Sequence, residues 1–177
     1  MPEKLVKTIS KLSNELVTVN KTRTVYNGFF SVKEFDLSFT KFDGSKSEEV
    51  TRSALISSDA VIVLPYDPLH DRVLLVEQFR TGPFARQDEI PWCLEPIAGL
   101  IDSGETPEEA AFREASEEAD LKLLRLELVA QSYPSPGMST EFFHQYIGIT
   151  SLPEDTDVVS GLASESEDIR SHIFSFP

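Results

Sequence analysis

The stretch from Gly99 to Leu121, GLIDSGETPEEAAFREASEEADL, constrains the fold most, because it joins a glycine-bearing loop to a dense run of acidic residues. Thr106, Pro107 and Glu109 predict the start of a helix. Threonine is a good N-cap, proline suits the first helical position, and a glutamate three residues after the cap can close a capping box. The sequence therefore predicts a short acidic helix that begins at Pro107.

Three glutamates of this helix share one face. Glu114 and Glu118 are four residues apart, and Glu117 follows Glu114 by three. Side chains at these spacings are neighbours, about 5–6 Å apart at their Cβ atoms, and like charges there destabilise a helix. Either water solvates the face, or a hard divalent cation such as Mg²⁺ or Mn²⁺ binds the carboxylates. The spacing alone leaves both interpretations open.

Alternating apolar residues predict strands through most of the remaining chain. The segment 22–42 reads as two strands broken at Asn27-Gly28, a strong turn dipeptide. Loops are expected over 81–91 and 151–167. Many strands with one clear helix predict an α+β fold or an α/β/α sandwich. The further expected strands cover 48–56, 60–66, 72–80, 92–97, 123–132, 141–149 and 169–174.

Charge and composition exclude several classes of function. The formal net charge of −14 over 177 residues argues against a nucleic-acid partner, which needs a basic surface. No apolar run approaches the length of about 18 residues that spans a membrane, and the N-terminus lacks a signal-peptide core. The single cysteine, Cys93, excludes an internal disulfide and suits a reducing compartment. We therefore expect a cytoplasmic protein without nucleic-acid or membrane partners.

The spacing of the charged residues resembles the signature of the Nudix hydrolases, G-x5-E-x7-R-E-U-x-E-E-x-G-U, where U is a bulky apolar residue. Gly99, Glu105, Arg113 and the three glutamates stand at the matching positions. Ala115 is small for its apolar position, and Asp120 replaces the glycine that ends the helix. Because aspartate tolerates the left-handed conformation better than most residues, we expect a working site with a slightly altered helix end.

This resemblance implies a Nudix-type α/β/α sandwich with a mixed sheet, in which a nucleoside diphosphate linked to another group is hydrolysed. It implies that Glu114, Glu118 and the backbone carbonyl of Ala98 bind the metal, and that Glu117 acts through a metal-bound water. The signature residues Gly99, Glu105 and Arg113 are then structural. The implied cofactor is Mg²⁺, with Mn²⁺ as the other candidate.

Two loops outside the signature resemble those of bacterial ADP-ribose pyrophosphatases. The segment 133–137, YPSPG, is similar to their SPG-type loop, and the acidic segment 161–170 is similar to their catalytic loop. The resemblance places the general base at Glu165 and a further metal ligand at Glu167; the other interpretation is a solvated acidic loop. It implies Mg²⁺-dependent hydrolysis of ADP-ribose to AMP and ribose 5-phosphate.

The same subgroup suggests residues that bind the substrate. Arg52 and Arg80 are candidates for the phosphates or the terminal ribose, since a forked donor suits anionic oxygens; otherwise they are ordinary strand charges. The ring pair Phe29 and Phe30 either stacks on adenine or packs in the core. Weaker candidates for sugar hydroxyls or metal-bound water are Glu95 and Glu141.

The resemblance also implies an assembly. We expect residues 1–57 to be N-terminal strands that bind the base and exchange between the subunits of a homodimer, and residues 58–177 to be the catalytic domain. We expect the chain to lack the C-terminal helix that covers the sheet in this family. Two alternatives remain: a hydrolase of another nucleoside diphosphate sugar such as GDP-mannose, and a non-catalytic nucleotide sensor. The histidines, His70, His144 and His172, match no zinc spacing.

Overall fold

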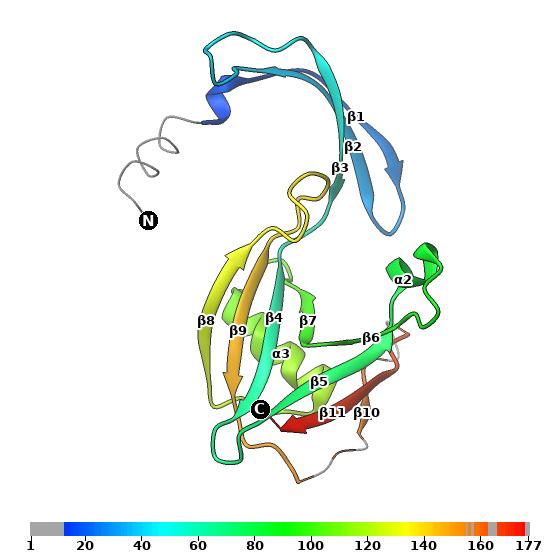
Figure 1. The fold of residues 1–177 in the computed structure, drawn as a ribbon, viewed down its shortest axis with the longest axis vertical. Helices are drawn as coiled ribbons and strands as arrows, with labels where there is room; N and C mark the ends of the chain where they lie inside the picture. Colours follow the sequence, from blue (N-terminus) through cyan, green and yellow to red (C-terminus); the bar gives the residue numbers. More distant parts are fainter. Residues whose placement is uncertain (1–12, 155, 157, 163–165, 176–177) are drawn as a thin grey trace. The chain divides into compact units, whose positions relative to one another are not determined.

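The computed structural model describes residues 13–154, 156, 158–162 and 166–175, and these divide into two compact units. The first unit comprises the chain up to Ser57 together with Ser135–Thr140, and the second comprises the rest (Figure 1). No helix in the described part is long and apolar enough to cross a membrane.

The first unit is an antiparallel three-stranded sheet in the order β1-β2-β3. The predicted break at Asn27-Gly28 is confirmed, because Asn27 pairs with Ser31 across the hairpin. A Cβ atom at Gly28 would lie 2.1 Å from the Tyr26 hydroxyl oxygen, so the ring of Tyr26 occupies the space of a side chain there. The elements of this unit are η1 (Asn14–Leu16), β1 (Val17–Asn27), β2 (Ser31–Phe39) and β3 (Val50–Ile56).

The loop Ser135–Thr140 extends this sheet beside β3. The Leu55 amide donates to the Met138 carbonyl oxygen at 2.8 Å, and the Thr140 amide donates to the Leu55 carbonyl oxygen at 3.0 Å. The Thr140 hydroxyl also bonds both backbone groups of Ser57. These residues thus belong by contact to the first unit, although the predicted catalytic domain, 58–177, includes them.

The second unit is a mixed eight-stranded sheet in the order β10-β11-β5-β4-β9-β8, with β6 beside β5 and β7 beside β4. The β4–β9 pair is parallel and the other described pairs are antiparallel. The predicted α+β class is confirmed. The strands are β4 (Ala60–Asp67), β5 (Arg72–Phe79), β6 (Trp92–Glu95), β7 (Ile97–Leu100), β8 (Arg125–Ser132), β9 (Phe143–Ile149), β10 (Val159–Ser160) and β11 (Ile169–Ser175).

Three predicted segments differ from the structure. The expected strand 92–97 is two strands, β6 and β7, because the chain passes at Pro96 from β5 to β4 and proline cannot donate to a ladder. The expected loop 81–91 contains a short helix, α2 (Thr81–Arg86), whose Pro83 stands in the first turn, where its missing N–H costs nothing. The expected loop 151–167 contains the two-residue strand β10.

The predicted acidic helix is confirmed as α3 (Pro107–Ala119), with the capping box between Thr106 and Glu109 formed in both directions. Its alanine face is buried in the core, where α3 packs across β4 and β7 (Figure 1). The helix ends at Asp120 in the left-handed conformation, with φ of 50°. The Asp120 amide donates to the Ser116 carbonyl oxygen at 3.1 Å, so the helix end is regular despite the missing glycine.

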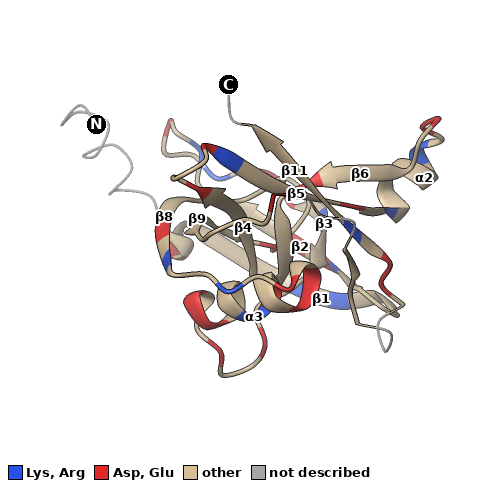
Figure 2. Ribbon diagram, turned by 90° about the horizontal axis from the view of Figure 1, so that it is seen from below, with Lys and Arg blue, Asp and Glu red and all other residues tan. Residues whose placement is uncertain are grey.

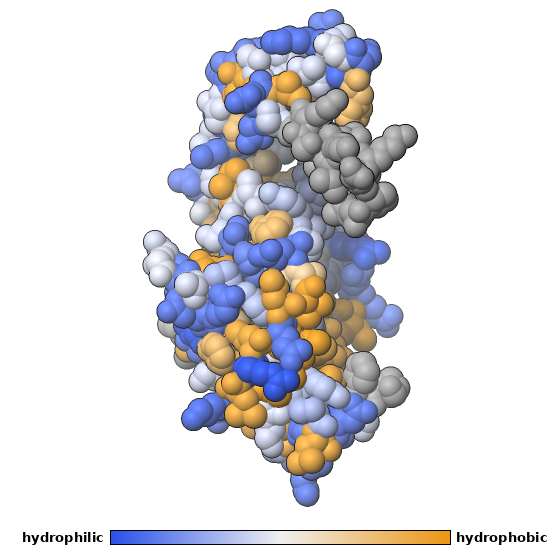
Figure 3. Space-filling view, turned by 90° about the vertical axis from the view of Figure 1, so that its left-hand side faces the viewer, coloured by the Kyte–Doolittle hydropathy of each residue, from blue (hydrophilic) through white to orange (hydrophobic). Residues whose placement is uncertain are grey.

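Only one face of the sheet is fully covered in the described chain. Residues of β4 and β5 that face α3, such as Val63 and Val76, are fully buried, whereas their neighbours Leu64 and Leu75 are half-buried. Apart from α3, the one α-helix within the described residues is the short α2. Figure 3 looks onto the β8 side, where apolar side chains reach the surface; Leu128 and Val129 of β8 are more than half exposed.

A buried carboxylate secures the turn after β4. Asp67 is 1% exposed, and it accepts hydrogen bonds from the amides of Leu69 at 2.9 Å and Leu152 at 3.0 Å. The His70 ring lies 2.9 Å from it and Arg72 lies 3.4 Å away. The hydrogen bond from His70, with help from the backbone amides, holds the pKa of Asp67 far below its usual range.

Replacing Asp67 by asparagine should lower the free energy of unfolding by about 2–4 kcal/mol, because buried donors lose a charged acceptor. Since the folded-state pKa lies below the unfolded value, the carboxylate stabilises the fold above about pH 4 and ceases to do so as the pH falls. Urea unfolding at pH 7 and pH 3 measures both effects. Asp88→Asn, in the exposed pair with Arg86, is the control; a gap that is equal at both pH values would contradict this role.

Candidate active site

Two glutamates of α3 are buried against β7. Glu118 is 2% exposed and Glu114 is 9% exposed. One oxygen of Glu118 accepts the Ala98 amide at 3.2 Å, and the other lies 3.5 Å from the Gln78 side-chain nitrogen. Burial raises the pKa of Glu118 to about 8, and the charges of Glu114 and Glu167 act in the same direction. Among the described residues Glu118 accepts from neutral donors and forms no ion pair, although the more distant charge of Arg80 acts to lower its pKa.

Gly99 makes room for Glu114. A Cβ atom at Gly99 would lie 1.8 Å from one carboxylate oxygen of Glu114 and 2.6 Å from the other. The glutamate thus lies directly on the backbone of β7, where any side chain would displace it. This contact explains physically why a glycine stands at the first position of the pattern.

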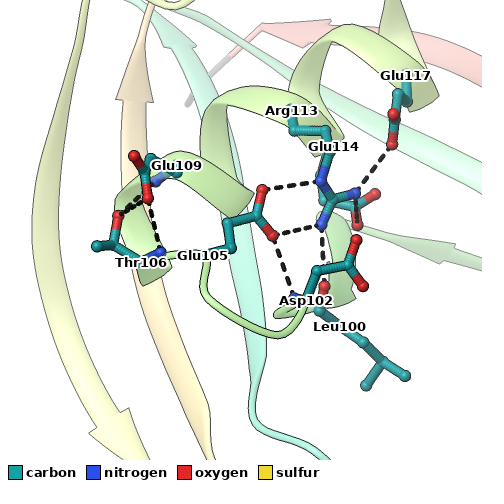
Figure 4. A network of polar contacts seen from close by, with 8 residues as sticks. All are labelled: Leu100, Asp102, Glu105, Thr106, Glu109, Arg113, Glu114 and Glu117. Atoms are coloured by element: carbon teal, nitrogen blue, oxygen red, sulfur yellow. Dashed lines mark hydrogen bonds and ion pairs between the residues drawn. The ribbon is translucent and has the colours of Figure 1, made fainter.

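Arg113 connects the loop before α3 to the helix (Figure 4). Its Nε and Nη2 donate to the two oxygens of Glu105, each at 2.9 Å. Its Nη1 donates to Glu114 at 2.6 Å and to Glu117 at 3.0 Å, and Nη2 also reaches the Leu100 carbonyl oxygen at 3.0 Å. The bonds to Glu105 and Glu114 keep the pKa of Arg113 well above its ordinary range. This one guanidinium therefore fixes three carboxylates.

The loop after β10 brings a further carboxylate to this region. The Leu162 amide donates to Glu167 at 2.9 Å. The charge of Glu167 is among those that raise the pKa of both Glu114 and Glu118, after the larger effect of burial, so the three carboxylates lie within electrostatic reach of one another. The predicted general base, Glu165, lies outside the described residues.

Glu114, Glu117 and Glu118 lie in α3 at the predicted spacing, and Nη1 of Arg113 bonds the carboxylates of both Glu114 and Glu117. In the described part of the chain, no three His, Cys, Asp or Glu side chains are arranged so that they could hold a metal ion. The donor set nevertheless fits a hard cation. A divalent ion would neutralise the buried charges of Glu114 and Glu118, and oxygen is the ligand that Mg²⁺ prefers. Acidic residues are concentrated in α3 and the loop before it (Figure 2).

Arg80 and Glu95 form a close ion pair in the second unit. Arg80 Nε lies 2.7 Å from one oxygen of Glu95, and Nη2 lies 3.2 Å from the other. Burial alone would lower the pKa of Arg80, but the bonds to Glu95 and the charges of Glu95 and Glu118 raise it. The predicted substrate residue Arg80 is therefore within electrostatic reach of Glu118.

The other predicted substrate residues lie in different parts of the chain. The rings of Phe29 and Phe30 pack edge to face in the first unit, with their centroids 4.7 Å apart. They are 90% and 46% exposed, so they are not core residues. Arg52 of β3 donates to the Thr51 carbonyl oxygen and is exposed. Glu141 precedes β9 in the second unit and is half-buried.

Gln78 is a residue of this region that sequence reasoning missed. It lies on β5, is 7% exposed, and its amide group approaches Glu118. The sequence signal for Gln78 was its two-residue spacing from Val76 and Leu74 along β5, which places its polar group on the face that α3 covers.

Each histidine lies beside a carboxylate, in the pairs His70–Asp67, His144–Asp59 and His172–Glu77.

The fold and this site place the chain in the class of Nudix enzymes. The family profile described as NUDIX domain matches residues 57–175, and the chain belongs to this family. It is similar to the ADP-ribose pyrophosphatase of Haemophilus influenzae, with 36% identity over 167 residues, covering 93% of this chain and 76% of that protein. It is 37% identical over 174 residues to the ADP-ribose pyrophosphatase of Escherichia coli K12, covering 98% and 81%.

More distant relatives also match. A GDP-mannose pyrophosphatase of Salmonella paratyphi B is 25% identical over 162 residues, which is 92% of this chain and 84% of that protein. A solved structure described as the crystal structure of an ADP compounds hydrolase has a TM-score of 0.65 at 21% identity, covering 93% of this chain and 81% of that one. The second comparison supports the fold.

Proposed function

We propose that this chain is a Nudix pyrophosphohydrolase that splits ADP-ribose into AMP and ribose 5-phosphate with the help of a divalent cation. The observation that carries the proposal is the buried pair Glu114 and Glu118, which α3 holds against β7 with no ion pair to Glu118 among the described residues. Sequence identity of 36% with an ADP-ribose pyrophosphatase over 93% of the chain supports the choice of substrate.

The proposed cation is Mg²⁺, with Mn²⁺ as a substitute. Glu114, Glu118, Glu167 and the Ala98 carbonyl would hold it, with the carboxylates drawn closer together than in this structure, and Glu117 would act through water. Bound there, the cation supplies charge neutralisation for the diphosphate oxygens and lowers the pKa of a water molecule. Arg113 orients Glu114 and Glu117 through ion pairs, and Glu105 in turn holds Arg113.

The proposed reaction is attack of water on one phosphorus of the diphosphate. A new phosphorus–oxygen bond forms, the bond to the bridging oxygen breaks, and the leaving phosphate keeps the electron pair. We assign the proton of the attacking water to Glu165, the general base that the resemblance of the segment 161–170 implies. AMP and ribose 5-phosphate are the two products.

Residues outside the signature are proposed to bind the substrate. Arg80 and Arg52 offer forked donors for phosphate or ribose oxygens, and Glu141 is a candidate for a hydroxyl. The exposed rings of Phe29 and Phe30 offer an apolar surface for adenine. A homodimer with exchanged N-terminal strands is also proposed. It is supported by the exposed apolar side chains of the first unit, including Val19, Val25 and Phe42.

A panel of nucleoside diphosphate sugars with Mg²⁺ tests the proposed function. We expect kcat/KM for ADP-ribose to exceed that for GDP-mannose by at least about tenfold, the equivalent of roughly 1.4 kcal/mol of transition-state binding. Phosphate release with a coupling phosphatase is the measurement, and chelated protein is the control. A preference for GDP-mannose would support the alternative substrate, whereas inactivity with every member of the panel would support a nucleotide sensor.

A further inference from the structure

The backbones that carry Arg80 and Glu95 are fixed to each other. Glu95 ends β6, which pairs antiparallel with β5, so that Glu95 lies opposite Val76. Arg80 follows β5 directly, and its amide donates to the Pro91 carbonyl oxygen at 2.9 Å. The distance between the two side chains is therefore set by a strand ladder and not by a loop.

The pair is bidentate. Nε and Nη2 of Arg80 each meet a different oxygen of Glu95, at 2.7 Å and 3.2 Å. Charge-assisted pairs of this form specify the plane of the guanidinium as well as its position. The side chain of Arg80 remains 40% exposed and that of Glu95 26% exposed. Within the described residues, Nη1 of Arg80 makes no hydrogen bond.

This geometry gives the two residues different roles. Each oxygen of Glu95 accepts one bond from Arg80, so this carboxylate holds one edge of the guanidinium in place. Arg80, in contrast, presents a free edge at Nη1, and its charge lies within reach of Glu118. The guanidinium can thus donate from that edge to an anionic oxygen while the other edge stays fixed.

We propose that Glu95 acts on the substrate through Arg80, as a positioning residue. This inference rests on the proposed function, in which Arg80 binds the diphosphate. The negative charge of Glu95 by itself weakens the binding of an anionic diphosphate. Glu95 therefore serves by orientation: it holds the fork in one plane, so that less freedom is lost when the diphosphate binds.

A double-mutant cycle separates positioning from contact. The four proteins are wild type, Arg80→Ala, Glu95→Ala and the double variant, measured for kcat/KM with ADP-ribose and Mg²⁺. Calorimetry with an α,β-methylene analogue of ADP-ribose gives a binding constant that does not depend on turnover. We expect Glu95→Ala to weaken both quantities about tenfold when Arg80 is present, within the effect of a misplaced group, and to change neither when Arg80 is absent.

Other outcomes overturn the proposal. If Glu95→Ala costs the same tenfold in the Arg80→Ala background, Glu95 touches the substrate directly. If Glu95→Ala or Glu95→Gln tightens binding of the analogue, its charge matters more than its orienting bonds. Glu127→Ala, which breaks the exposed pair with Arg125 on β8 at 2.7 Å, is the matched control and should leave both quantities unchanged. Urea unfolding excludes a loss of folded protein.

The proposed function and this inference can fail separately. If the wild type does not hydrolyse ADP-ribose yet binds the analogue, the proposed function fails and the cycle is still decided by the binding constants. If the wild type hydrolyses ADP-ribose and the cycle shows no coupling between Arg80 and Glu95, only the inference fails. A wild-type protein that neither hydrolyses ADP-ribose nor binds the analogue overturns both.

Discussion

Replacing Glu118 by glutamine should lower kcat/KM for ADP-ribose by about 10³-fold, because the loss of a cation ligand removes several kcal/mol of charge stabilisation from the transition state. Glutamine has nearly the same shape and still offers an oxygen to the Ala98 amide, which lies 3.2 Å from Glu118. Calorimetric titration with Mn²⁺ should show the matching loss of metal affinity. Glu127→Gln removes the same charge from the surface of β8 and should leave activity unchanged.

The same substitution should have the opposite effect on the stability of the metal-free protein. Burial raises the pKa of Glu118 to about 8, above its unfolded value of about 4.3. The folded state therefore binds more protons than the unfolded state between these pH values, and stability falls as the pH rises from about 4 to 8. Glu118→Gln should remove this decline in chelated protein. A variant that is less stable than wild type at pH 8, or that retains full turnover, would contradict the site.

Replacing Gly99 by alanine should reduce metal affinity and turnover by at least about 10²-fold while the protein still folds. The new Cβ atom would lie 1.8 Å from the Glu114 carboxylate, which must move. Because the obstructing atoms are the end of a flexible side chain, the backbone of β7 can stay in place. The cost falls on the position of Glu114, and a displacement of about 1 Å is enough to cost such a factor.

The control for this substitution is Gly82→Ala in α2, where an added Cβ atom would meet nothing within 4 Å. It should leave Mn²⁺ affinity and turnover unchanged and should not lower the urea midpoint. Gly148→Ala gives the contrasting result, because its Cβ would lie 2.9 Å from the core side chains of Leu123 and Val63. That variant should unfold at lower urea concentration. If Gly99→Ala binds Mn²⁺ as wild type does, the close approach of Glu114 is not needed.

Local rules predicted the elements whose signals lie within a few residues. The capping box at Thr106 and Glu109 formed as expected, and Asp120 adopted the left-handed conformation that its short side chain tolerates. The strand break after Asn27 also lies where the turn dipeptide predicted it, although neither Asn27 nor Gly28 has a positive φ. In each case the residues that decide the conformation are neighbours in sequence, so tertiary contacts had little to override.

Features that depend on distant partners were not predictable in this way. At Pro96 the chain changes its pairing from β5 to β4, and this change depends on where those two strands lie. The segment Ser135–Thr140 belongs to the first unit because of its hydrogen bonds to Leu55 and Ser57. The resemblance already gave Arg113 a structural role, but the sequence could not reveal that its one guanidinium bonds Glu105, Glu114 and Glu117 together. Nor could it reveal that Arg80 engages both oxygens of Glu95.

The most direct test of the central claim is the formation of AMP from ADP-ribose as metal-free protein is titrated with Mg²⁺. If α3 carries a cation site that serves diphosphate hydrolysis, AMP and ribose 5-phosphate form in equal amounts, at a rate that rises from background to saturation with the metal. Equal rates in chelator and in saturating Mg²⁺, or saturable Mg²⁺ binding without cleavage of ADP-ribose, would contradict the claim.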